Sequence, residues 1–277
     1  MKPSVAHLVF AVIVAGVSAP TVFAQAIPTR ATPAESPQKV TRIHEGLSWP
    51  VGMAYDASGN LYIANWSAGT VLRFTPDGSR SIFAEGIAGP SGLAISPTGD
   101  IYVASYHDDL VWRFTPAGDR NVFVRGLATP AGLSFDARGR LLIANRRSNQ
   151  ILAAHPDGKI DVVANDLQTP VGVVELANGD LLVSNIAGGI SLVSGASPAR
   201  TINSELRSPG PGIVPAGTDS IYVVDYGGTT VSRIERNGRR TVIADGLGSP
   251  VGLTRAPDGS LMVATWGANA AFRLTMP

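Results

Sequence analysis

Two sets of side chains recur at intervals of 40 residues and include the types that could do chemistry. The first set consists of short polar residues that could act as oxygen ligands or hydrogen-bonding groups: Asn65, Ser105, Asn145, Asn185, Asp225 and Thr265. The second set follows one position later and is mostly aromatic or basic: Trp66, Tyr106, Arg146, Ile186, Tyr226 and Trp266. Polar side chains of the first set could coordinate a cation, or could cap strands by bonding nearby backbone amides. Rings and guanidinium groups of the second set suit an apolar or anionic ligand, or could pack between loops.

Three neighbouring residues extend these sets. Trp49 precedes the first repeated unit, so three of the four tryptophans fall near one end of the units. His107 lies in the stretch YHDDL, which could bind a metal or transfer protons, or could be a solvated loop. Arg147 doubles the positive charge of Arg146, and the pair could contact a carboxylate or lie solvated on the surface.

The elements that position these side chains follow from the repeat itself. Each unit of 40 residues contains one glycine at a fixed place: Gly52, Gly92, Gly132, Gly172, Gly212 and Gly252. Apolar alternation and glycine-containing turns in the first unit predict strands at 51–55, 61–65, 70–75 and 80–84. Short strands with this period indicate propeller blades rather than helical repeats. Both sets of side chains then lie at the end of each second strand, on the face where the loops diverge in sequence.

The two ends of the chain predict how the ring closes. The last unit ends without a fourth strand, and the stretch QKVTRIHE at 38–45 is in register with the missing one. In that register Ile43 aligns with Phe83 and Phe123 and should cover an apolar face. We therefore predict an all-β fold, a six-bladed β-propeller over residues 38–277, with the ring closed by an N-terminal strand that completes the last blade.

The unit P-x-G-L followed by G-x-hydrophobic-Y-V-A-N resembles the NHL repeat, and the resemblance covers residues 38–277. In general architecture the chain also resembles the gluconolactonase and regucalcin-like superfamily. That second resemblance implies a divalent cation held by acidic and amide side chains, some of them at the x position of P-x-G motifs. Here the x positions are apolar or small: Val51, Ser91, Ala131, Val171, Pro211 and Val251. A cation held only by Asn145, Asn185 and Asp225 would therefore bind weakly.

Three functions are compatible with the sequence. We favour a non-catalytic NHL-type module that binds a small molecule or a protein at the channel mouth, without a cofactor. The residues predicted to bind this ligand are Trp49, Trp66, Tyr106, His107, Arg146, Arg147, Tyr226 and Trp266. The alternative is a hydrolase or lyase of the gluconolactonase superfamily with a weak site for Ca²⁺ or another divalent cation at Asn145, Asn185 and Asp225. A third hypothesis is a partner docked along the outer strands.

Composition and the N-terminus bear on location and partners. A formal net charge of +1 gives no electrostatic basis for binding nucleic acid, and the absence of cysteine excludes disulfides and thiolate sites. A short basic start, an apolar run at 8–19 and small residues at Ala24 and Ala26 predict a signal peptide over 1–24, cleaved near 24–26. Residues 25–37 read as a flexible leader. We therefore expect a periplasmic or secreted monomer without a membrane span.

Overall fold

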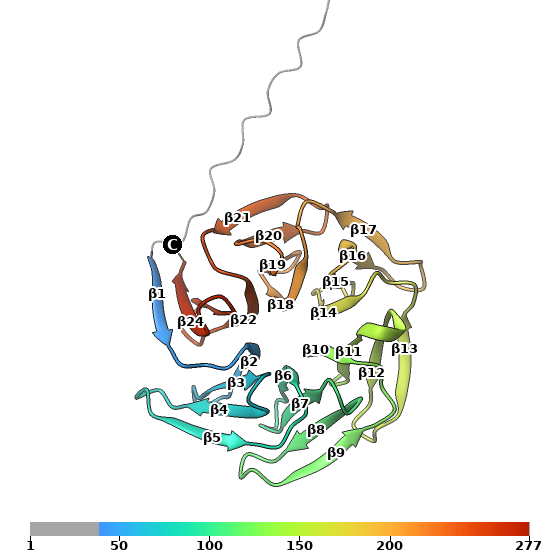
Figure 1. The fold of residues 1–277 in the computed structure, drawn as a ribbon. Helices are drawn as coiled ribbons and strands as arrows, with labels where there is room; N and C mark the ends of the chain where they lie inside the picture. The colour runs from blue at the N-terminus through green and yellow to red at the C-terminus, as the bar shows by residue number, and fades with distance from the viewer. Residues whose placement is uncertain (1–38, 277) are drawn as a thin grey trace, which may run out of the picture. The chain divides into compact units, whose positions relative to one another are not determined.

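Six four-stranded antiparallel sheets form a ring in the computed structural model, which describes residues 39–276 (Figure 1). The six-bladed propeller predicted from the sequence is confirmed. The predicted signal peptide and leader lie outside the described residues. Within residues 39–276, no helix has both the length and the apolar character needed to cross a membrane.

The strands follow the 40-residue period closely. Blade one comprises β2 (Pro50–Tyr55), β3 (Leu61–Asn65), β4 (Thr70–Phe74) and β5 (Arg80–Ala84). Blade two comprises β6 (Pro90–Ile95), β7 (Ile101–Ser105), β8 (Leu110–Phe114) and β9 (Arg120–Val124). Blade three comprises β10 (Pro130–Phe135), β11 (Leu141–Asn145), the short 3-10 helix η1 (Arg146–Ser148), β12 (Gln150–Ala154) and β13 (Ile160–Ala164).

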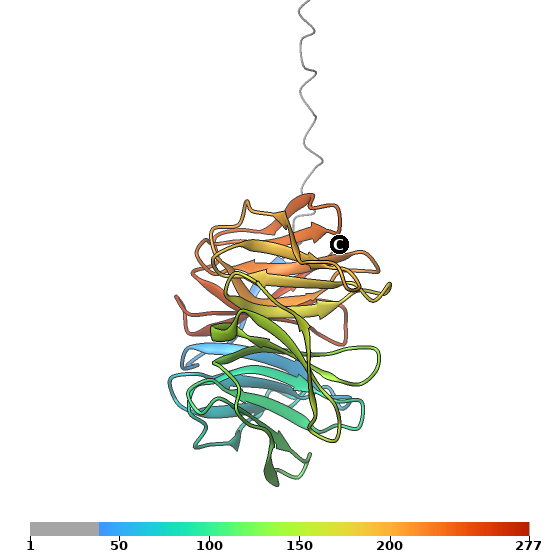
Figure 2. The same ribbon diagram turned by 90° about the vertical axis from the view of Figure 1, so that its right-hand side faces the viewer.

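The second half of the ring repeats this order. Blade four comprises β14 (Pro170–Glu175), β15 (Leu181–Asn185), β16 (Gly189–Val193) and β17 (Arg200–Asn203). Blade five comprises β18 (Pro209–Pro215), β19 (Ser220–Asp225), β20 (Val231–Glu235) and β21 (Arg240–Ala244). Blade six comprises β22 (Pro250–Arg255), β23 (Leu261–Thr265), β24 (Ala270–Thr275) and, from the start of the chain, β1 (Lys39–His44). Seen from the side, the ring carries loops on its two opposite faces (Figure 2).

The N-terminal strand closes the ring as predicted, and Ile43 covers the apolar face beneath it only in part. Strand β1 pairs antiparallel with β24, from Lys39 opposite Thr275 to His44 opposite Ala271. A bulge between Arg42 and His44 leaves Ile43 unpaired, as the equivalent bulge leaves Phe83 in blade one. Ile43 is 38% exposed, and it borders the apolar hollow that Tyr55 and Phe74 also line, so it covers this face only in part. The inward contact comes from the next residue, His44, whose ring stacks on Phe74 of blade one.

The hydrophobic core lies between neighbouring blades. On one face of β3, Leu61 and Ile63 pack with Met262 and Ala264 of blade six. On its other face, Tyr62 and Ala64 pack with residues of β7 in blade two. Alternate side chains of each second strand thus serve opposite faces, and all five residues of β3 are buried. The blades are held to one another by these clusters, because a single blade cannot bury both of its faces.

The glycines that mark the repeat lie where the innermost strands of adjacent blades approach one another. A Cβ atom at Gly92 would lie 2.2 Å from the backbone oxygen of Ala131, and one at Gly132 would lie 2.4 Å from that of Val171. Contacts this short are not tolerated between a side chain and a backbone carbonyl. The absence of a side chain therefore lets six blades meet around a narrow centre.

His44 predicts a loss of stability in mild acid. Its ring centroid is 3.9 Å from that of Phe74. Burial, assisted by the positive charges of Arg273 and Arg80, lowers the pKa of His44 below its usual value. The unfolded chain then takes up a proton that the folded chain does not. The free energy of unfolding should therefore fall as the pH drops through about 6.5, and level off below the lowered pKa.

Denaturant unfolding at about pH 7.5 and about pH 5.5 measures this effect. The matched control is His44→Phe, which keeps an aromatic ring against Phe74 but cannot titrate. We expect this variant to lose a large part of the difference between the two pH values. The same pH dependence in the variant and the parent protein would show that His44 is not the group responsible.

Candidate functional site

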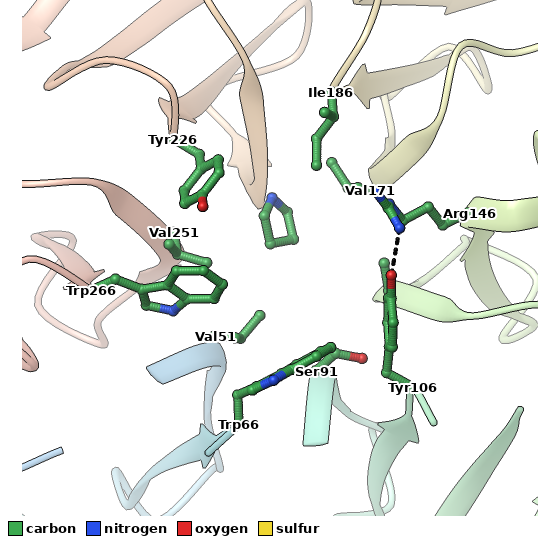
Figure 3. Close-up of a pocket in the computed structure, with 12 residues that line it drawn as sticks. Val51, Trp66, Ser91, Tyr106, Arg146, Val171, Ile186, Tyr226, Val251 and Trp266 are labelled. Atoms are coloured by element: carbon green, nitrogen blue, oxygen red, sulfur yellow. Dashed lines mark hydrogen bonds between the residues drawn. The ribbon is translucent and has the colours of Figure 1, made fainter. Parts of the chain in front are cut away.

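A cavity of about 260 Å³ is lined by two residues from each of the six blades, which places it on the axis of the ring (Figure 3). The first residue of each pair is the x position of the P-x-G motif, at the start of the innermost strand: Val51, Ser91, Ala131, Val171, Pro211 and Val251. We call these six residues the floor. Two of them, Val51 and Pro211, also border a second hollow, so the floor lies between that hollow and the cavity. The second residue of each pair directly follows the second strand: Trp66, Tyr106, Arg146, Ile186, Tyr226 and Trp266. We call these six residues the wall.

Backbone hydrogen bonds hold the main chain of five of the six wall residues, and in blade five the following residue, Gly227, makes the bond. The N–H of Trp66 donates to the carbonyl oxygen of Trp49 at 3.1 Å, and the N–H of Trp266 donates to that of Ser249 at 3.1 Å. Equivalent bonds hold Tyr106, Arg146 and Ile186 to the loop that enters their own blade. The wall side chains are thus carried by loops that are tied to the rigid ring, which is the arrangement expected for a preformed site.

The aromatic wall residues contact one another in two pairs. The rings of Trp66 and Tyr106 meet edge to face with centroids 4.6 Å apart, and those of Tyr226 and Trp266 do so at 5.2 Å. In Figure 3 the rings of Trp66 and Tyr106 are seen edge-on, with a face of each turned toward the middle of the cavity. The indole N–H of Trp266 is already used, since it donates to the carbonyl oxygen of Pro50 at 3.0 Å. The sequence-predicted aromatic arc therefore surrounds the cavity on several sides.

Arg146 supplies the only charge among the twelve lining residues. It lies at the start of η1, and its Nη1 donates to the hydroxyl of Tyr106. Its guanidinium carbon is also 5.9 Å from the centre of the Tyr106 ring. Within residues 39–276 Arg146 forms no ion pair, so its positive charge is not neutralised by the protein.

The polar set that ends the second strands does not face the cavity. Its six members are almost fully buried, and four of them bind the loops between blades. The Oδ1 atoms of Asn65 and Asn145 accept from the backbone N–H groups of Ser48 and Ala128. Asp225 accepts from two consecutive backbone N–H groups, at 2.9 and 3.1 Å. Asn185 donates to two backbone carbonyls and to the hydroxyl of Ser191. Asn65, Ser105, Asn145 and Asp225 thus position the loops between blades, which is one of the two interpretations that the sequence leaves open, whereas Asn185 bonds within its own blade.

Three of the predicted ligand-binding residues lie outside the lining. The Trp49 ring stacks on Trp266, with centroids 5.0 Å apart, rather than beside Trp66, and is 48% exposed at the rim. His107 packs behind the wall, with its ring against Trp66 and Tyr106. Arg147 is exposed and forms an ion pair with Asp109 at 2.8 Å.

Trp49 also has an unusual backbone conformation. Its φ of +50° lies in the left-handed region, which is unfavourable for a bulky residue. Thr129, Thr169 and Ser249 hold the same place in their blades with φ between +48° and +60°, and Gly89 does so without strain. A tryptophan at this place presents a large exposed ring at the rim, next to Trp266.

The floor is the part of the site that the sequence interpretation missed. Its side chains are mostly apolar, and apolar side chains give no chemical signal in a sequence. The signal that could have found them is the shared 40-residue spacing, which places one floor residue and one wall residue at equivalent points of each blade. Ser91 is the one polar floor residue, and its buried hydroxyl donates to the backbone carbonyl of Pro130 at 2.9 Å.

Known structures share this fold. A gluconolactonase from Xanthomonas campestris superposes with a TM-score of 0.76 at 18% sequence identity, over 86% of this chain and 89% of that chain. A catalytically inactive virginiamycin B lyase from Staphylococcus aureus, solved with quinupristin, gives a TM-score of 0.67 at 20% identity, over 86% and 85%. A chain of a nidogen/laminin complex gives 0.61 at 20% identity, over 69% and 82%. No family model and no curated protein matches the sequence.

These likenesses support the propeller architecture predicted from the 40-residue repeat. At this level of identity they carry no activity to the chain. The NHL repeat is supported by the sequence motif and stays a prediction.

The lining residues do not fit a bound divalent cation. Such ions take carboxylate, amide or backbone oxygens, or imidazole nitrogens. The twelve lining side chains include no carboxylate, amide or histidine. Of the three residues named for the alternative cation site, Asn145 and Asp225 already bind backbone N–H groups of the loops. The buried Oδ1 of Asn185 has no hydrogen-bond partner within residues 39–276, and one amide oxygen by itself does not make a divalent-cation site.

Proposed function

We propose that this protein binds a small, largely apolar molecule in the axial cavity. The observation that carries the proposal is the lining itself, which joins an apolar floor to four aromatic rings and a single unpaired guanidinium. Apolar and aromatic walls with few polar groups are typical of small-molecule sites. The N-terminal sequence pattern supports a role in the periplasm or outside the cell.

The hydrolase or lyase alternative is second in our ranking. It is favoured by the shared fold with a gluconolactonase and a virginiamycin B lyase. Against it, the lining offers no base: the hydroxyl of Ser91 bonds to backbone carbonyls, and no carboxylate or imidazole lines the cavity. A hydroxyl without a neighbouring base is a weak nucleophile.

Filling the cavity mouth tests the binding proposal. Blades one and six carry tryptophan in the wall, whereas blade four carries Ile186 at the equivalent position. The repeat therefore accommodates Ile186→Trp, while the larger ring would occupy part of the 260 Å³. We expect calorimetry with a set of neutral, anionic and cationic aromatic fragments to find ligands whose affinity falls at least about tenfold in the variant.

The matched control is Ala117→Phe, an enlargement at an exposed turn on the opposite face of the ring. This variant should bind the fragments as the parent protein does. Equal fragment binding by Ile186→Trp and the parent protein would place the ligands outside the cavity and would refute the proposed function.

A further inference from the structure

The hydrogen-bonding groups of the cavity are donors in excess of acceptors. The indole N–H of Trp66 and the hydroxyl of Tyr226 have no hydrogen-bond partner within residues 39–276, and Arg146 uses only its Nη1, in the bond to Tyr106. From these groups, and resting on the proposed function, we propose that the ligand is a small aromatic carboxylate whose carboxyl group binds Arg146.

Arg146 is prepared for a carboxylate. Only its Nη1 atom has a partner, the Tyr106 hydroxyl, so the remaining N–H groups of the guanidinium are available. The bond to Tyr106 and the position in η1 hold the side chain in place before a ligand arrives. A planar guanidinium can donate two parallel hydrogen bonds to a carboxylate.

The same inventory disfavours other ligand classes. Sugars and other polyols present many donors, which need carboxylate or amide acceptors, and the lining has none. A ligand with only positive charge would be repelled by Arg146, whose charge no described carboxylate balances. A neutral apolar molecule would pack well, yet it would leave the guanidinium without an anionic partner.

The aromatic rings and the floor determine the size and the apolar character of the rest of the ligand. The faces of Trp66 and Tyr106 that border the cavity offer flat stacking surfaces (Figure 3). Beneath them, the floor is aliphatic except for Ser91. The volume of about 260 Å³ corresponds to about nine water molecules of liquid, which admits one or two fused aromatic rings with a carboxyl group.

Calorimetry with naphthoate and naphthamide tests this inference, because the two probes have nearly the same shape and differ in charge. We expect the parent protein to bind naphthoate at least about tenfold more tightly than naphthamide. Arg146→Met should remove this preference, lowering affinity for naphthoate at least about tenfold and for naphthamide by no more than about twofold. Arg146→Lys, which keeps the charge without the planar fork, should retain part of the preference.

Arg147→Met is the matched control, since Arg147 is the adjacent arginine but is exposed and paired with Asp109 outside the lining. It should bind both probes as the parent protein does. Circular dichroism of each variant establishes that it is folded.

The outcomes separate this inference from the proposed function. Equal affinity for the two probes, or a preference that survives Arg146→Met, would overturn the carboxylate assignment. If the binding of those probes is still lost in Ile186→Trp, the cavity remains the binding site. Failure of both probes and of every fragment to bind would overturn the carboxylate assignment and the proposed function together.

Discussion

Replacing Gly252 by alanine is expected to lower the free energy of unfolding by about 3 kcal/mol or more. The new Cβ would lie 2.1 Å from the carbonyl oxygen of Val51 in blade one and 3.1 Å from the Cβ of Ala264. Because the nearest atom belongs to the backbone, no change of rotamer can relieve the contact. The contact would strain the interface between blade six and blade one, where the ring closes.

The control for this prediction is Gly248→Ala, four positions earlier. Its new Cβ would be 3.5 Å from the nearest atom, the Cα of Gly267, which is an ordinary contact, and its φ does not lie in the left-handed region. Chemical denaturation of the two variants measures the difference. If both lose the same small amount of stability, the close approach of the inner strands does not explain why each unit carries this glycine.

Deleting residues 38–45 is expected to have a still larger effect, leaving a protein that aggregates or does not fold cooperatively. Strand β1 is the partner of β24, and its removal would expose the backbone groups of that strand as an open edge. It would also remove the contact of His44 with Phe74 and uncover the apolar hollow around Tyr55 and Phe74. Size-exclusion chromatography and thermal unfolding measure the outcome.

Deleting residues 25–37 is the comparison for that experiment. The pairing of β1 with β24 uses only residues 39–44 and 271–275, so this deletion should leave the melting temperature unchanged. Equal melting temperatures for the two deletions would contradict closure of the ring by the N-terminal strand.

The strands and their order could be predicted because the information is local and repeated. In the first unit, the predicted strands 61–65 and 80–84 coincide with β3 and β5, and the other two differ from β2 and β4 by one residue at one end. Period-2 alternation and glycine turns determine such elements over a few residues, and six copies reinforce the pattern. Closure could be predicted for the same reason, since residues 38–45 continue the register of the repeat.

Side-chain directions at bulges and loops could not be predicted in this way. Ile43 shares with Phe83 both the alignment and a bulge that leaves the residue unpaired, yet Phe83 packs against the core whereas Ile43 is 38% exposed. Trp49 has a left-handed backbone and stacks on Trp266, and the sequence pattern reveals neither. The side chain of Asn145 could bind a cation or a loop amide, and the loop amide of Ala128 occupies it at 2.7 Å.

The most direct measurement of the central claim is a crystal structure of the protein grown with naphthoate and calcium together. The account predicts the naphthalene rings in the axial cavity against Trp66 and Tyr106, with the carboxylate oxygens about 3 Å from guanidinium nitrogens of Arg146. Naphthoate bound elsewhere, with a calcium ion coordinated by Asn145, Asn185 and Asp225 at the channel mouth, would contradict it.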